Sequence, residues 1–189
     1  MSYLTIGAGI LGLIAAFVFF YVLKFKASTK QTQRTDRIRW SNFIPYRNET
    51  FDRDLKKLKL EIESYKNERN IWKIDRSITN STGNLCLHII GNLNWFIGAQ
   101  FGNTGYVRDR ELEFSLKNIP RVDLLIEIDK TMLMLDNALL KITTDQLEAD
   151  YPVLVFKQKT STYYFLIHLT THLSYHLGQI NYHRRLLNE

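Results

Sequence analysis

Residues 168–186 read HLTTHLSYHLGQINYHRRL and contain four of the 5 histidines of this 189-residue chain. An α-helix advances about 100° per residue, so His168, His172 and His176 lie on nearly one face of a helix. Two histidines at positions i and i+4 can share one metal ion. The segment therefore predicts a long amphipathic helix that presents imidazoles for metal binding.

Apolar residues at helical spacing predict two further helices in the middle of the chain. The first helix of the chain begins near Glu49 and buries one stripe of side chains, which consists of Phe51, Leu55, Leu58, Ile62 and Tyr65. The second helix, over about 81–102, is capped by Ser81 or Thr82 and ends near Gly102.

A third helix is predicted over about 121–142, because Pro120 suits the first turn of a helix. The segment 102–119 before it is long enough for a crossover. Thr160 or Thr162 caps the last helix, which runs to about Leu187. Only residues 153–156 resemble a strand. The pattern predicts an all-α four-helix bundle, in which metal sites are commonly assembled from facing helices.

His88 lies in the second predicted helix, in register with Leu85 and Trp95, and so faces the core or its rim. With two histidines of the last helix it would supply three nitrogen ligands and leave a fourth position open, as in catalytic zinc sites. Imidazole also suits nickel, iron and cobalt. The spacing alone leaves two pairs open, His168 with His172 or His172 with His176.

Two other residues are expected outside this site. His183 adjoins Arg184 and Arg185, where a cationic side chain suits the C-terminal dipole of the helix. Cys86 is about 200° around the helix from His88 and faces away from it. As the single cysteine it excludes an intramolecular disulfide and fits a reducing compartment.

The formal net charge of +6 is concentrated near the N-terminus. Residues 1–39 hold 6 of the 25 basic side chains and 1 of the 19 acidic ones, which leaves residues 40–189 with a net charge of +1. The predicted bundle therefore lacks the basic surface of a nucleic-acid-binding protein, and no nucleic-acid partner is expected.

Residues 3–23 contain no charged side chain, and as a helix they would span about 32 Å, enough to cross a bilayer. They predict a transmembrane helix, followed by a basic juxtamembrane linker over 24–48 and the bundle domain over 49–189. Basic residues follow the apolar run, which predicts a single-pass membrane protein with a cytoplasmic C-terminal domain. Ala8 and Gly12 would allow close helix contact and hence a homo-oligomer.

Three segments resemble a bacterial subfamily of unknown function within the DinB-like superfamily of metalloenzymes. They are GNLCLHIIGNLNWFIGA (83–99), NTGYVRDRELEFS (103–115) and HLTTHLSYHLGQINYHRRL (168–186), the last with the motif H-x-x-x-H-x-G-Q. The resemblance covers about residues 50–188 and implies an up-down-down-up bundle. It also implies that His88, His172 and His176 bind a divalent metal, usually zinc or nickel, with His168 beside them.

The resemblance departs from the family pattern at Leu173, where relatives often carry an acid or an amide. It implies a small-molecule substrate and a low-molecular-weight thiol, because the superfamily includes thiol-dependent transferases and isomerases. The alternatives are a metal-dependent hydrolase, with His168 moving protons, and a non-catalytic membrane-tethered metal-binding bundle. Tyr106, Arg108, Asp109 and Tyr175 would suit an entrance, but polar loop residues are usually only solvated, and no catalytic role is predicted for them.

Overall fold

The computed structural model describes residues 21–29, 48–75 and 77–187. Residues 48–187 belong to one compact unit, and residues 21–29 belong to another. Within the described ranges every regular element is helical, and the only β-pairing is one isolated bridge between Asp150 and Ser161. This agrees with the all-α class predicted from the sequence.

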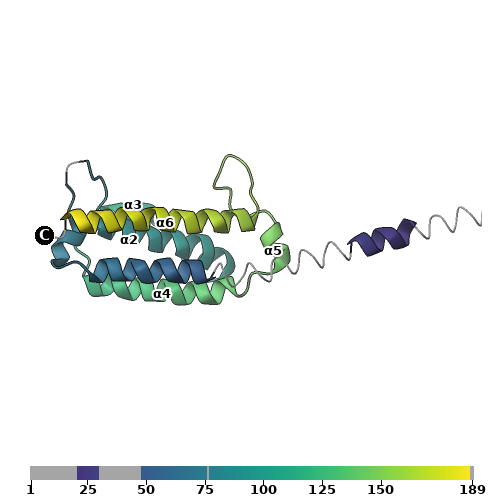
Figure 1. Ribbon diagram of the computed structural model, residues 1–189, viewed down its shortest axis with the longest axis horizontal. Coiled ribbons are helices and arrows are strands. Elements are labelled where there is room, and N and C mark those ends of the chain that lie inside the picture. Colours follow the sequence, from purple (N-terminus) through teal and green to yellow (C-terminus); the bar gives the residue numbers. More distant parts are fainter. Residues whose placement is uncertain (1–20, 30–47, 76, 188–189) are drawn as a thin grey trace, which may run out of the picture. The chain divides into compact units, whose positions relative to one another are not determined.

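Four long helices form the bundle (Figure 1). They are the helix over residues 48–63, α2 (Thr82–Leu93), α4 (Arg121–Leu139) and α6 (Thr162–Leu187). A π-helix, η2 (Asn94–Ala99), continues α2. Three short helices lie in the connections, and these are η1 (Glu68–Trp72), α3 (Arg110–Ser115) and α5 (Thr144–Glu148).

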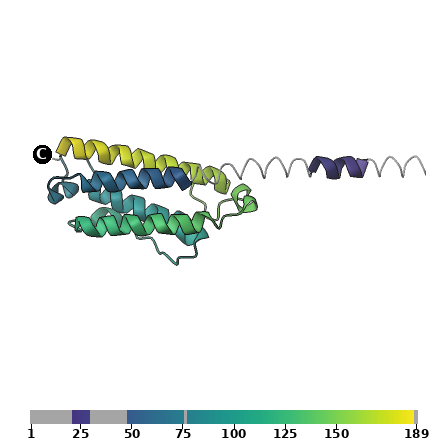
Figure 2. The same cartoon turned by 60° about the horizontal axis from the view of Figure 1, so that its bottom comes forward.

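Contacts at the helix ends give the directions of the helices. Asn181, near the end of α6, donates to Glu61 Oε1 at 2.7 Å, so α6 runs parallel to the helix over 48–63. Arg121, at the start of α4, donates to the Tyr65 carbonyl at 2.7 Å, so α4 runs antiparallel to that helix. Helix α2 also begins at this end (Figure 2), which makes the order up-down-down-up.

The core lies between the four long helices and includes the stripe predicted for the first of them. Each buried Leu, Ile or Phe side chain stabilises the fold by about 1.5–3 kcal/mol. Along α6 the buried positions Leu166, Leu169 and Leu173 are followed next by Ile180, a gap of two helical turns. His176 lies in this gap and is half-buried, so the site occupies a place where the core face of α6 is interrupted.

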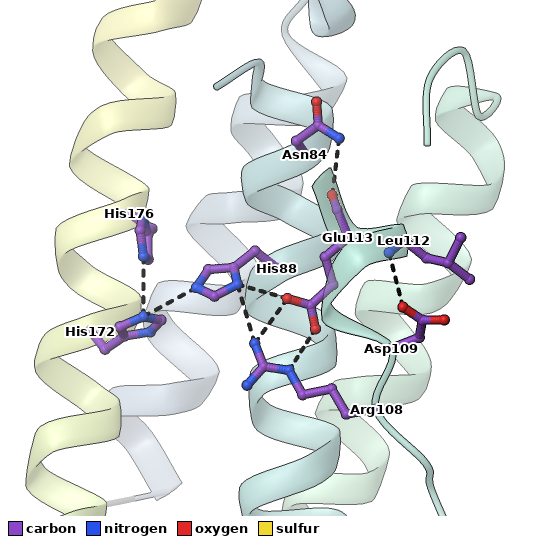
Figure 3. Close-up of polar contacts among 8 residues, drawn as sticks. All are labelled: Asn84, His88, Arg108, Asp109, Leu112, Glu113, His172 and His176. Carbon is purple, nitrogen blue, oxygen red and sulfur yellow. Dashed lines mark hydrogen bonds and ion pairs between the residues drawn. The ribbon is translucent and has the colours of Figure 1, made fainter. Parts of the chain in front are cut away.

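The crossover between α2 and α4 contains a short helix that the periodicity did not predict. Asp109 caps α3 by accepting from the Leu112 amide at 3.1 Å. Asn84 of α2 holds the C-terminal end of α3, because its Nδ2 donates to the carbonyls of Glu113 and Leu116, both at 2.9 Å. Helix α3 is thereby fixed against α2 beside the histidines (Figure 3).

Residues 153–156, the one stretch whose sequence resembles a strand, form a loop with bends. The loop is closed at its base instead, where the Tyr151 amide donates to the Thr160 carbonyl at 2.8 Å. Before it, Thr143 and Gln146 form a capping box that starts α5.

The predicted transmembrane helix over residues 3–23, and with it the single-pass membrane localisation, is contradicted. Among the described residues no helix has both the length and the apolar character needed to cross a membrane. Residues 3–20 of the predicted span, with Ala8 and Gly12, lie outside the described ranges. Residues 21–23 are helical, and the described helical residues 21–29 span about 14 Å.

Candidate metal centre

Three histidines from two helices meet on one side of the bundle. His88 comes from α2, and His172 and His176 come from successive turns of α6 (Figure 3). The Nε2 atom of His172 lies 3.3 Å from His88 Nε2 and 3.1 Å from His176 Nε2. His88 is buried, and the two α6 histidines are half-buried. The group could hold a metal ion, with side chains on both helices as ligands.

The nitrogen spacings fit a tetrahedral ion. Zinc–nitrogen bonds of about 2.0–2.1 Å place two ligand nitrogens about 3.3 Å apart at a tetrahedral angle. The two Nε2–Nε2 distances from His172, 3.3 Å to His88 and 3.1 Å to His176, are close to that value. Three histidines leave the fourth position of such an ion for another ligand.

The proton positions of two imidazoles also fit metal binding. Glu113 Oε2 lies 2.8 Å from His88 Nδ1 and accepts its proton, while Gln179 Oε1 accepts the Nδ1 proton of His176 at 2.7 Å. Each imidazole in this tautomer turns the lone pair of Nε2 toward His172. Carboxylates and carbonyls in this role orient histidine ligands and raise their basicity. Gln179 is the glutamine of the H-x-x-x-H-x-G-Q motif.

Glu113 is held in turn by Arg108. The Arg108 guanidinium donates from Nε to Oε1 at 2.6 Å and from Nη2 to Oε2 at 2.8 Å, a bidentate pair. Burial alone would raise the pKa of Glu113, but the hydrogen bonds from His88 and Arg108 outweigh it and lower the pKa. The carboxylate therefore stays ionised although only 5% of the residue is exposed.

Gly91 makes room for this carboxylate. A Cβ atom at Gly91 would lie 2.2 Å from Glu113 Oε1 and 2.9 Å from its Cδ. We expect Gly91→Ala to push Glu113 away from His88 and to weaken metal binding at least about tenfold, the loss typical when such a partner is removed. Equilibrium zinc titration of the full chain measures this change in metal affinity.

Gly178 supplies a matched control for that substitution. A Cβ atom there meets no described atom within 4 Å, although the residue lies on α6 between His176 and Gln179. Gly178→Ala should leave zinc affinity unchanged and stabilise the helix by about 0.5–1 kcal/mol. Equal zinc affinity in the two variants would show that the space at Gly91 does not matter to the centre.

His172 and His176 remain neutral over a wide pH range. Burial, followed by the neighbouring His176 and His88 imidazoles, lowers the pKa of His172 to about 3. Burial likewise lowers the pKa of His176. Neutral imidazoles bind a cation without net loss of a charge-bearing proton near neutral pH, so we expect protonation of His172 and His176 to weaken metal binding only well below pH 6, where free histidine is protonated.

The lowered pKa of His172 also makes the stability of the metal-free protein depend on pH. His172 has a pKa of 6.5 in the unfolded chain and about 3 in the folded one, so the unfolded state binds more protons between these values. The free energy of unfolding should fall as the pH drops from 6.5 toward 3. Denaturant unfolding should show a shallower pH dependence for His172→Gln, whereas an unchanged slope would contradict the shift.

The other two histidines of α6 have different surroundings. His168 is not part of the three-histidine group, and its ring centroid lies 6.1 Å from that of His172 and 4.9 Å from that of Phe156. Burial lowers the pKa of His168, which keeps it neutral. It is a neighbour of the centre, on the face that the sequence predicted.

His183 is buried away from the centre rather than charged at the helix end. Its Nδ1 accepts from the Tyr65 hydroxyl at 2.7 Å, and its Nε2 donates to the Lys73 carbonyl at 2.9 Å. Burial lowers its pKa, so the expected cationic role beside the helix dipole is wrong. The residue ties α6 to the end of the first helix and to the segment after η1.

Sequence reasoning missed Glu113 and gave Arg108 no role. The two residues lie 5 apart in a polar segment, and Glu113 is 25 positions from His88. The available signal was the Asp109 cap, which predicts a helix that could carry Glu113. Leu173, where the resemblance is broken, is buried in the core.

No family model matches the chain, and no curated protein is similar enough to match it. The argument for metal binding therefore rests on the geometry of the three-histidine centre.

Proposed function

We propose that this protein is a divalent-metal-dependent enzyme of the DinB-like kind, with zinc or nickel bound by His88, His172 and His176. The observation that carries the proposal is the convergence of three imidazoles, in which the Nε2 atoms of His88 and His176 lie 3.3 and 3.1 Å from that of His172. Hydrogen bonds that orient two of them support a built centre rather than a chance cluster.

The reaction we propose is thiol transfer to an electrophilic small molecule. A divalent cation with an open position would lower the pKa of a thiol there and so supply a thiolate near neutral pH. Glu113 and Gln179 would keep two imidazoles oriented during the reaction. The resemblance of residues 50–188 to the DinB-like superfamily supports this substrate class.

The thiol must come from outside the chain. Cys86 is the single cysteine, and burial raises its pKa to about 12, so its thiolate is not available. It also faces away from His88 on α2. A low-molecular-weight thiol is therefore the reactant that the proposal requires.

Metal-assisted hydrolysis is the second candidate, and His168 is the observation that favours it. This imidazole is kept neutral by burial and lies beside His172 without belonging to the metal group. A neutral imidazole in that place can accept a proton from a water molecule.

A screen of the metal-loaded full chain distinguishes these functions. Zinc- and nickel-loaded protein would be incubated with electrophiles in the presence and absence of several small thiols, with His172→Ala as the control. Turnover that needs thiol, metal and His172 together is the expected result. Turnover without thiol would favour hydrolysis, and metal binding without any turnover would contradict an enzymatic function.

A further inference from the structure

Asn92 is a buried polar residue with an unused hydrogen-bond acceptor. The residue is 6% exposed, and its Oδ1 atom is buried without a hydrogen-bond partner among the described residues. Buried side-chain oxygens in folded proteins almost always accept a hydrogen bond. An acceptor left over beside a metal centre indicates the place where a ligand donates.

Asn92 lies on the face of α2 that borders the centre. It follows His88 by one turn, about 40° around the helix, and lies four residues before Phe96 of η2. His88 and Phe96 both contact side chains of α6. Arg108 reaches both of these residues. Its Nη2 atom lies 3.2 Å from His88 Nδ1, and its guanidinium carbon lies 5.6 Å from the Phe96 ring centroid. Asn92 therefore lies between two residues of the same chain segment, His88 and Phe96, that both contact α6 and Arg108.

The helix changes its geometry immediately after Asn92. The π-helix η2 begins at Asn94, and its wider turns alter the register of the side chains that follow. Such insertions into α-helices occur frequently at functional sites. The change separates the regular turn that carries His88 and Asn92 from the segment that carries Phe96.

We infer that Asn92 Oδ1 binds the substrate or co-substrate of the metal centre. The ligand is a small molecule that takes the open position of the metal with one atom and donates an N–H or O–H group to Asn92. One helical turn, about 5.4 Å, separates Asn92 from His88, so the donor lies within a few ångströms of the metal-binding atom. This inference rests on the proposed function, because the ligand completes the metal centre.

Imidazole and 1-methylimidazole are matched probes for this acceptor. Both bind transition metals through an unsubstituted ring nitrogen, but only imidazole keeps an N–H group on the far side of the ring. Cobalt-loaded full chain would be titrated with each probe, with visible absorption as the readout. We expect imidazole to bind about tenfold more tightly than 1-methylimidazole, the effect of one buried hydrogen bond.

Variants assign that preference to Asn92. Asn92→Leu should abolish the preference for imidazole and leave the cobalt content unchanged. Asn92→Asp, which keeps an acceptor at the same place, should retain it. Asn137→Leu, at an exposed position of α4, should also retain it and serves as the matched control.

The outcomes separate this inference from the proposed function. Equal affinity for the two probes in the wild-type protein, or a preference that persists in Asn92→Leu, would overturn the role of Asn92 while the metal centre stands. Failure of the protein to bind cobalt would overturn both.

Discussion

Replacing His172 with alanine should reduce the metal content of the full chain from about one ion per chain to nearly none. His172 is the common member of the centre, since its Nε2 lies within 3.3 Å of the Nε2 atoms of both His88 and His176. The variant leaves two nitrogen ligands on separate helices, which is below the three of catalytic zinc sites. Elemental analysis after dialysis measures the loss.

The remaining histidines provide the comparison for that result. His88→Ala and His176→Ala should also lose metal, whereas His168→Ala and His183→Ala should keep it. His183→Ala should nevertheless unfold more easily, because it loses the two hydrogen bonds that His183 makes with the Tyr65 hydroxyl and the Lys73 carbonyl. Full metal occupancy in all three ligand variants would contradict the site, and loss in His168→Ala would assign that residue as a ligand.

Replacing Glu113 with alanine should lower both metal affinity and stability. His88 would lose the acceptor of its Nδ1 proton, and removal of such partners typically costs 10–100-fold in metal affinity. Arg108, whose side chain is 13% exposed, would lose the carboxylate that pairs with it. Breaking a buried pair in this way costs about 3–5 kcal/mol of unfolding free energy. Zinc titration and denaturant unfolding measure the two effects.

Glu111 is the matched control for Glu113, because it lies in α3 but is exposed. Glu111→Ala should change neither metal affinity nor stability appreciably. Glu113→Gln keeps an acceptor for His88 but removes the charge, so its metal affinity should fall between those of the wild type and Glu113→Ala. Equal zinc affinity for Glu111→Ala and Glu113→Ala would refute the role of the carboxylate.

The long helices could be predicted because their signals are local. The stripe from Phe51 to Tyr65 is buried as its spacing indicates, and Ser81 caps α2 by accepting from the Asn84 amide at 3.3 Å. Helix α3 has only 6 residues, too few for a periodic pattern, and it is fixed by side-chain contacts from Asn84. Such contacts join distant parts of the chain and leave no local pattern.

The metal centre likewise combines features that follow from local sequence with features that depend on contacts between distant segments. His172 and His176 come together through helix geometry alone, so their proximity follows from their spacing in the sequence. The partnership of His88 with Glu113 depends on how the crossover folds back, which no spacing rule contains. The surroundings of His183 differ from the prediction for a related reason. Helix-dipole reasoning uses only the residue's own helix, whereas Tyr65 of another segment determines the surroundings of His183.

X-ray absorption at the metal edge of the zinc-loaded full chain tests the central claim most directly. We expect three imidazole nitrogens at about 2.0–2.1 Å and one further light ligand that small molecules can replace. The imidazole signal should fall in His172→Ala. A spectrum with fewer than three imidazoles, or with four protein ligands that no small molecule displaces, would contradict an open three-histidine centre.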